Sequence, residues 1–258
     1  MRLSCLICLL GILAVAGCRT VPPPTPVPRL ASSEEVLSIL KARQTGLDSF
    51  QAKGRLTLIA PGRSYSGTAR LKGSLPSTLR VDVLDFFGRS LLNFASDGQQ
   101  VEVLFPRESK LFYGPATPAN LAAFVPPGVT VDQALKVVAG DLPLSSGEPA
   151  EYRYDAATES YLLTWRNPGG SLKEKLWVDS QSLHPVKEEW YGSDGKLTFT
   201  AELSEFAGNR PQQIIFKTTE PATELRLALQ DMELNPSFNR ADLRVPQLPG
   251  VQRVPFRP

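Results

Sequence analysis

Histidine and cysteine, two residue types that often carry out catalysis, are scarce in this chain. Its one histidine is His184, which argues against both a metal site of several histidines and a Ser-His-Asp triad. Asp82 and Asp85 are close in sequence, but alternation along a strand puts them on opposite faces, against acid–base catalysis. Gly169-Gly170 is not followed by the lysine and helix of a phosphate-binding loop. We therefore expect no enzymatic activity, no metal site and no cofactor.

All the cysteines lie near the start of the chain, at Cys5, Cys8 and Cys18, so no disulfide or zinc–thiolate site can form beyond them. Leu3–Ala16 is a charge-free apolar run that follows Arg2. This run is shorter than the roughly 20 apolar residues that a membrane span needs. A positive residue followed by a short apolar run is typical of a secretory signal peptide.

The end of that run, Val15-Ala16-Gly17-Cys18, resembles the bacterial lipobox. The resemblance implies cleavage before Cys18 and attachment of acyl chains, such as palmitate, to the new terminal cysteine. One acyl chain anchors a protein marginally, whereas two or more hold it firmly in membrane lipid. The alternatives are a plain secretory signal with an incidental cysteine, or an N-terminal anchor.

The residue after the cysteine suggests which membrane receives the anchor. In enteric bacteria an aspartate there favours the inner membrane, and this chain has Arg19 instead. We therefore expect lipid anchoring in the outer membrane, with the protein facing the periplasm.

Composition and proline content suggest the domain organisation. Net charge is +2, and removal of residues 1–17, whose single charged residue is Arg2, leaves +1. This near-neutrality argues against nucleic acid as a partner. Prolines in residues 18–31 favour an extended tether. We expect a signal peptide at 1–17, this tether, one monomeric domain at 32–234, and a proline-rich tail at 235–258 with little regular structure.

Periodicity within 32–234 predicts mostly strands. Ser32 and Glu35 fit a capping box before an apolar helical stripe. About five strands follow between residues 50 and 105, two helical segments begin near residues 117 and 130, and about six more strands follow from residue 151. The charged triplets 173–175 and 187–189 are expected on solvated strand faces. Several inward-facing positions are glycines, which leave room for something else: Gly54, Gly67 and Gly73.

No internal boundary interrupts this order, so we expect an α+β, mainly β fold. It would be a single curved antiparallel sheet of about 11 strands with helices on one face.

Three segments resemble the LolA/LolB superfamily of periplasmic lipoprotein carriers. They are Phe50–Leu56 with Tyr65–Leu71, Leu79–Leu92 with Asp97-Gly98, and the helix end Val138–Pro143. Together with the lipobox, they resemble the membrane-anchored LolB more than the soluble LolA. The resemblance implies an unclosed half-barrel whose concave face, covered by helices, holds acyl chains of lipoproteins or lipids. A soluble periplasmic carrier is then a further candidate partner.

A lipid cavity would be lined by inward-facing apolar residues, and carrying an acyl chain of some sixteen carbons through water would otherwise cost roughly 12 kcal/mol. The alternative is that the same residues form a dry core. The candidate lining residues are Leu56, Ala69, Leu71, Val81, Val83, Val103, Leu135, Val138, Leu163, Leu176, Leu203 and Leu227.

Phe86 and Phe87 lie between two predicted strands, where LolB-type carriers project an apolar residue that assists membrane insertion. The resemblance therefore predicts a membrane-insertion loop, and the alternative is that the rings fold back into the core. The leading functional hypothesis is a non-enzymatic acceptor or carrier of lipidated proteins or lipids. Two others remain: a lipid-sensing or protein-binding module that regulates a partner, and a structural outer-membrane accessory lipoprotein.

Overall fold

The computed structural model describes residues 29–43, 46–121, 124, 130–140, 142 and 145–256. Cys18, the predicted signal peptide and most of the predicted tether lie outside the described residues. None of the helices among the described residues combines the length and apolarity needed to cross a membrane.

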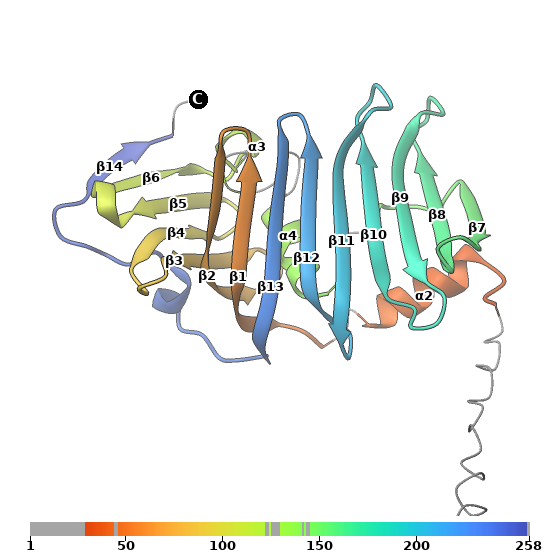
Figure 1. Ribbon diagram of the computed structural model, residues 1–258, viewed down its shortest axis with the longest axis horizontal. Coiled ribbons are helices and arrows are strands. Elements are labelled where there is room, and N and C mark those ends of the chain that lie inside the picture. The colour runs from red at the N-terminus through yellow and green to blue at the C-terminus, as the bar shows by residue number, and fades with distance from the viewer. Residues whose placement is uncertain are drawn as a thin grey trace, which may run out of the picture.

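Fourteen strands form one sheet (Figure 1). The first meander runs through β1 (Ser49–Ala60), β2 (Arg63–Ser74), β3 (Thr78–Leu84), β4 (Ser90–Ser96), β5 (Gln100–Phe105) and β6 (Lys110–Pro115). The second runs through β7 (Glu151–Asp155), β8 (Ser160–Arg166), β9 (Leu172–Asp179), β10 (Pro185–Tyr191), β11 (Leu197–Ala207), β12 (Arg210–Thr219) and β13 (Ala222–Leu234). Strand β1 pairs antiparallel with β13, which joins the two meanders at the middle of the sheet.

The sheet is not closed, because its edge strands are β7 and β14 (Gln252–Pro255) and they do not pair with each other. The predicted mainly β, unclosed half-barrel is therefore confirmed, with 14 strands rather than about 11. Strand β6 was missed because Gly114 and Pro115 interrupt its short alternation. Strand β14 was missed because it pairs with β6, far away in sequence, and this pairing is parallel.

The expectation of little regular structure after residue 235 is wrong. A short 3-10 helix, η3 (Arg240–Leu243), precedes β14. Val245 packs with Ala95, Leu104 and Leu111 in a second apolar cluster, separate from the main core. Proline is tolerated on an edge strand because its missing N–H faces away from the ladder, so β14 accommodates Pro255. The tail thus covers outward-facing residues of β4, β5 and β6.

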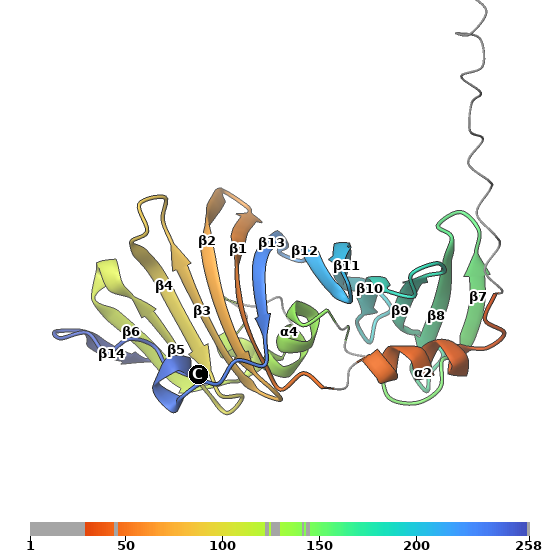
Figure 2. The same ribbon diagram turned by 90° about the horizontal axis from the view of Figure 1, so that it is seen from below.

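Two helices lie on the same side of the sheet (Figure 2): α2 (Ser33–Arg43) below β8–β10, and α4 (Val131–Val138) below β12 and β13. Short helical turns, η2 (Pro106–Glu108) and α3 (Pro118–Leu121), lie in the connections. Before α2, the hydroxyl of Ser32 accepts the Glu35 N–H at 3.3 Å, while the Glu35 carboxylate reaches past the cap to the N–H of Ala31 at 2.7 Å.

Helix α4 begins where the sequence predicted a helix start, near residue 130, and a capping box fixes this start. The Thr130 hydroxyl accepts the Gln133 N–H, and the Gln133 side chain accepts the Thr130 N–H. The helix ends before Gly140, whose φ of +89° is readily adopted only by glycine. Its apolar side chains join α2 and both meanders in one main core.

Candidate functional site

The concave face is the first candidate site, and it is apolar across both meanders. Ten of the twelve predicted lining residues are buried, and Leu56 and Val81 are partly buried. All of them except Val83 belong to the main core or pack against it. Nine of the predicted residues therefore lie on strands that contribute to one apolar core, and Leu135 and Val138 join that core from helix α4.

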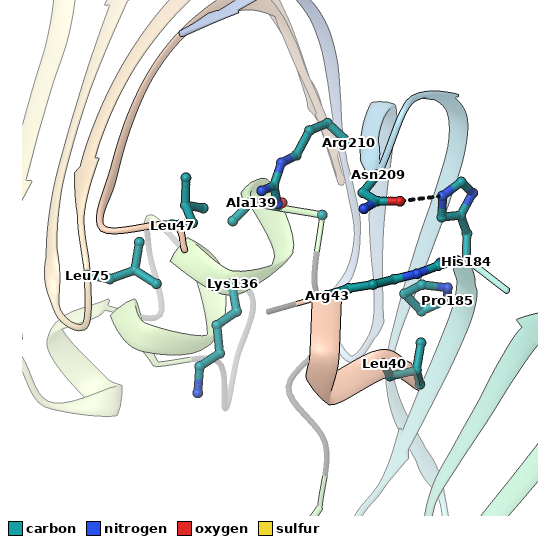
Figure 3. Close-up of a pocket in the computed structure, with 11 residues that line it drawn as sticks. Leu40, Arg43, Leu47, Leu75, Lys136, Ala139, His184, Pro185, Asn209 and Arg210 are labelled. Carbon is teal, nitrogen blue, oxygen red and sulfur yellow. Dashed lines mark hydrogen bonds between the residues drawn. The ribbon is translucent and has the colours of Figure 1, made fainter. Parts of the chain in front are cut away.

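Among the described residues, most apolar side chains of this face are buried by their neighbours. A cavity of about 40 Å³ lies where α2 and α4 end, next to His184 and Asn209 (Figure 3). For comparison, an apolar cavity of about 150 Å³ binds a benzene molecule. An acyl chain would fit here only after one of the helices moved.

Polar contacts from two arginines help hold the helices in place. Arg43, at the end of α2, donates to the carbonyl oxygens of Leu183 at 2.7 Å and Ser182 at 2.8 Å. Arg210, on β12, reaches across to donate to the carbonyl of Ala139 just after α4 (Figure 3). Since a cation near a helix C-terminus also interacts favourably with the helix dipole, Arg210 stabilises the closed position of α4.

Glycine on the sheet lets α4 approach closely. Gly73 faces inward on β2, and a Cβ atom built there would lie 2.7 Å from Leu135 Cδ2 and would also collide with the ring of Phe50. The room that Gly73 leaves is thus taken by a side chain of α4 and a neighbouring aromatic ring.

Two carboxylates lie on the concave side, contrary to the expectation that their charged triplets are solvated. Glu174 is 3% exposed and Glu188 is fully buried. Trp190 Nε1 donates to Glu188 at 2.6 Å, and the Ser145 N–H approaches Glu174 at 3.5 Å. Burial raises the pKa of Glu174, although hydrogen bonds with Ser145 and Glu188 oppose the shift. The triplets misled because in each one the middle residue, Glu174 or Glu188, lies on the opposite face of the strand from its two charged neighbours.

This raised pKa predicts that stability declines as pH rises. The carboxyl group of Glu174 holds its proton more tightly in the folded protein than in the unfolded chain, whose pKa is about 4.5. The protonated group therefore contributes its full stability below about pH 4.5, and this contribution is lost as the pH rises through the folded-state pKa. We expect Glu174→Gln to flatten the fall in melting temperature as the pH rises above about 4.5. Calorimetric unfolding across this range measures it, with the exposed Glu220→Gln as control. An unchanged slope in Glu174→Gln would exclude this assignment.

The turn between β3 and β4 is the second candidate site. Phe86 is 96% exposed and Phe87 is 77% exposed, so neither ring folds back into the core. Their ring centroids lie 5.5 Å apart in an edge-to-face arrangement. The structure thus displays both rings where the resemblance placed a membrane-insertion loop.

Asp85 organises this turn. Its Oδ1 atom accepts the N–H groups of Phe87 and Arg89, both at 2.9 Å, and its Oδ2 atom contacts the guanidinium groups of Arg89 at 2.9 Å and Arg107 at 2.6 Å. Desolvation works to raise the pKa of Asp85, but the hydrogen bonds and charge of Arg89 outweigh it, so the pKa lies below its usual value. The carboxylate therefore stays charged at neutral pH and fixes the turn.

The other residues that were considered for catalysis, His184 and Asp82, make contacts that stabilise the fold. His184 stacks on Phe206 with a centroid distance of 4.1 Å, and its Nε2 lies 3.4 Å from Asn209 Oδ1. Asp82 pairs with Arg80 and accepts from Asn93 at 2.6 Å. Within the described part of the chain, no group of three or more histidines, cysteines or carboxylates is arranged to hold a metal ion.

Three solved structures resemble this fold. A LolA superfamily protein from Nitrosomonas europaea is 16% identical, with a TM-score of 0.54, over 84% of this chain and 99% of its own. An outer membrane lipoprotein-sorting protein domain from Vibrio parahaemolyticus is 14% identical, with a TM-score of 0.54, over 81% of this chain and 94% of its own. A DUF1329 family protein from Desulfovibrio piger is 9% identical, with a TM-score of 0.55, over 81% and 97%.

The sequence matches no protein-family model and no curated protein. At these identities the structural comparisons concern the fold. The chain therefore shares its fold with these three structures, one of which is a LolA superfamily protein.

Proposed function

We propose that this protein is an outer-membrane lipoprotein that accepts or carries lipidated proteins or lipids, with acyl chains held against its concave face. The observation that carries the proposal is the continuous apolar face of an unclosed half-barrel, covered by only a few short helices. Similarity in fold to a LolA superfamily protein and to a lipoprotein-sorting domain supports it.

The anchor in this proposal is Cys18, joined to the domain by the tether of residues 18–31. The acyl groups would keep the protein at the membrane, and the exposed rings of Phe86 and Phe87 would enter the same or a facing lipid surface. Removal of residues 1–17 would leave Cys18 as the first residue of the mature chain.

Loading would require α2 or α4 to move away from the sheet, because the cavity between their ends is only about 40 Å³. Opening exposes apolar surface to water, which costs free energy. An acyl chain that takes the place of the helices recovers about 0.8 kcal/mol for each methylene group that it buries. The closed form is then the empty state of the carrier.

The direct test is to purify the chain without residues 1–17 and with Cys18→Ala, and to identify bound lipids by mass spectrometry. The proposal expects co-purified acyl lipids, or uptake of a fluorescent fatty acid by the empty protein. Depletion in the cell should cause lipoproteins to accumulate in the periplasm. Absence of any bound or exchangeable acyl compound, together with normal lipoprotein localisation, would contradict the proposal.

The contact between Arg210 and Ala139 gives a prediction about opening. Arg210→Met removes a donor that holds α4 closed. The apparent affinity for a ligand is low when most of the protein is closed, and loss of the Arg210 contact increases the open fraction. We therefore expect Arg210→Met to bind a fluorescent fatty acid about ten times more tightly. Arg166→Met is the matched control, because Arg166 also donates to a backbone carbonyl, that of Gly170 at 2.9 Å, outside the helices. Equal affinity in both variants would show that α4 does not gate binding.

A structural accessory lipoprotein is the second candidate, and the well-filled interior favours it. In that case the core would stay closed, and Arg210→Met would lower stability without any gain in fatty-acid binding. The same titration therefore distinguishes the two candidates.

A further inference from the structure

We propose that the β3–β4 turn, together with Arg107, is a docking site for a bilayer that contains anionic phospholipid. The rings of Phe86 and Phe87 would enter the acyl region while the guanidinium groups of Arg89 and Arg107 bind headgroup phosphates. This inference rests on the membrane contact in the proposed function, and it adds the lipid class and the residues that select it.

The rings and the positive charges lie in one small region. The guanidinium carbon of Arg89 lies 5.3 Å from the centroid of the Phe87 ring, which places a cation beside the more buried of the two rings. Arg107 comes from the neighbouring β5–β6 connection and meets Arg89 on the same oxygen of Asp85. Two hairpin ends thus contribute to one surface of aromatic rings bordered by guanidinium groups.

The arginines keep capacity for a ligand while bound to Asp85. Each guanidinium carries five N–H donors. Arg89 contacts Asp85 through its Nε and one terminal nitrogen, and Arg107 contacts Asp85 through one terminal nitrogen. Their side chains are 66% and 55% exposed, whereas that of Asp85 is 14% exposed. The three groups sum to one positive charge, and the outward donors suit phosphate oxygens.

The nearby charges do not cancel this excess. Lys110 and Glu108, which flank the same β5–β6 connection, pair with each other at 3.6 Å and contribute no net charge. Tyr65, which faces Asp85 and Arg107, has a pKa raised by desolvation and by the Asp85 charge, so its phenol is neutral. The surface toward the rings therefore remains positive.

The size of the apolar patch favours lipid over protein as the occupant. A stable protein interface buries about 800 Å² on each partner, far more than two rings supply. Aromatic rings beside arginines are instead typical of segments that enter the interfacial zone of a bilayer, where rings insert and cations meet phosphates. The rigid turn also lowers the entropic cost of insertion, because Asp85 already holds the backbone.

Vesicle binding tests the proposal. The chain without residues 1–17 and with Cys18→Ala is mixed with vesicles of phosphatidylcholine alone or of phosphatidylcholine with phosphatidylglycerol, and bound protein is measured by flotation. We expect tighter binding to the phosphatidylglycerol vesicles and loss of that gain at high salt. Arg89→Gln with Arg107→Gln should weaken this binding about 25-fold and leave phosphatidylcholine binding unchanged.

Further variants separate the outcomes. Arg153→Gln is the matched control, since Arg153 is 61% exposed and pairs with Asp155 on the distant edge strand β7, and it should bind like the wild type. Arg89→Lys with Arg107→Lys keeps the charge and should restore most of the binding. The proposal is overturned if the glutamine variant binds phosphatidylglycerol vesicles as the wild type does, or if inorganic phosphate competes as well as vesicles. Fatty-acid uptake should be unchanged in all these variants. The uptake assay thus tests the proposed carrier function, and vesicle flotation tests the docking site independently of it.

Discussion

Replacing Phe86 and Phe87 together with serine is expected to weaken vesicle binding about a hundredfold without changing the free energy of unfolding. Full burial of one phenylalanine side chain is worth about 1.5–3 kcal/mol, so partial insertion of two rings contributes about 3 kcal/mol. The rings are 96% and 77% exposed, so the folded domain loses almost no packing when they are removed. Flotation with vesicles and denaturant unfolding measure the two effects.

The control for this prediction is Leu234→Ser. Leu234 is 46% exposed and ends β13, where it pairs with Phe50. That row of the sheet lies at the opposite end of the strands from the β3–β4 turn. The control should bind vesicles normally. If the double serine variant folds normally, binds vesicles like the wild type and still delivers lipoproteins, the turn does not insert into membranes.

Replacing Gly73 with valine is expected to force α4 away from the sheet. The added side chain would compete for the space of Leu135 and the Phe50 ring. Overpacking of this kind costs about 2–3 kcal/mol, or roughly 5 to 10 °C in melting temperature. Under the carrier proposal, the same change raises the affinity for a fluorescent fatty acid, because less free energy is needed to open the concave face.

Gly67→Val is the matched control for Gly73→Val. Gly67 faces the same side of β2, but a Cβ atom there would meet Tyr65 and the carbonyl of Leu84 rather than α4. It should destabilise the protein without a gain in fatty-acid affinity. Hydrogen exchange of the α4 amides gives an independent measure of release. If exchange in α4 stays as slow in Gly73→Val as in the wild type, the helix has not been displaced and the explanation is wrong.

Most of the sheet could be predicted because its determinants are local. Strands β1 and β2 alternate inward and outward side chains along their whole length, and the pairing of Leu56 with Gly67 and of Ala52 with Leu71 keeps apolar residues on one face. Alternation of apolar and polar residues can be recognised within the sequence of each single strand. The helix start at Thr130 was equally readable, because the capping residues are neighbours in sequence.

The errors concern residues whose state depends on distant partners. Glu174 and Glu188 were expected in water, but the strand register turns them toward the concave side, where Trp190 and Ser145 meet them. Strand β14 exists because β6 offers a free edge, and that edge arises from segments far away in the chain. Local patterns carry no information on such pairings.

The sequence by itself determined the features that short segments encode: the lipobox-like segment ending at Cys18, the alternating strands and the capped helices. Only the tertiary structure decided whether the rings of Phe86 and Phe87 face solvent, which side chain fills the space beside Gly73, and how far the apolar residues of the concave face are buried. The physical reason is that exposure and packing depend on contacts between residues far apart in sequence, whereas capping and alternation depend on neighbours.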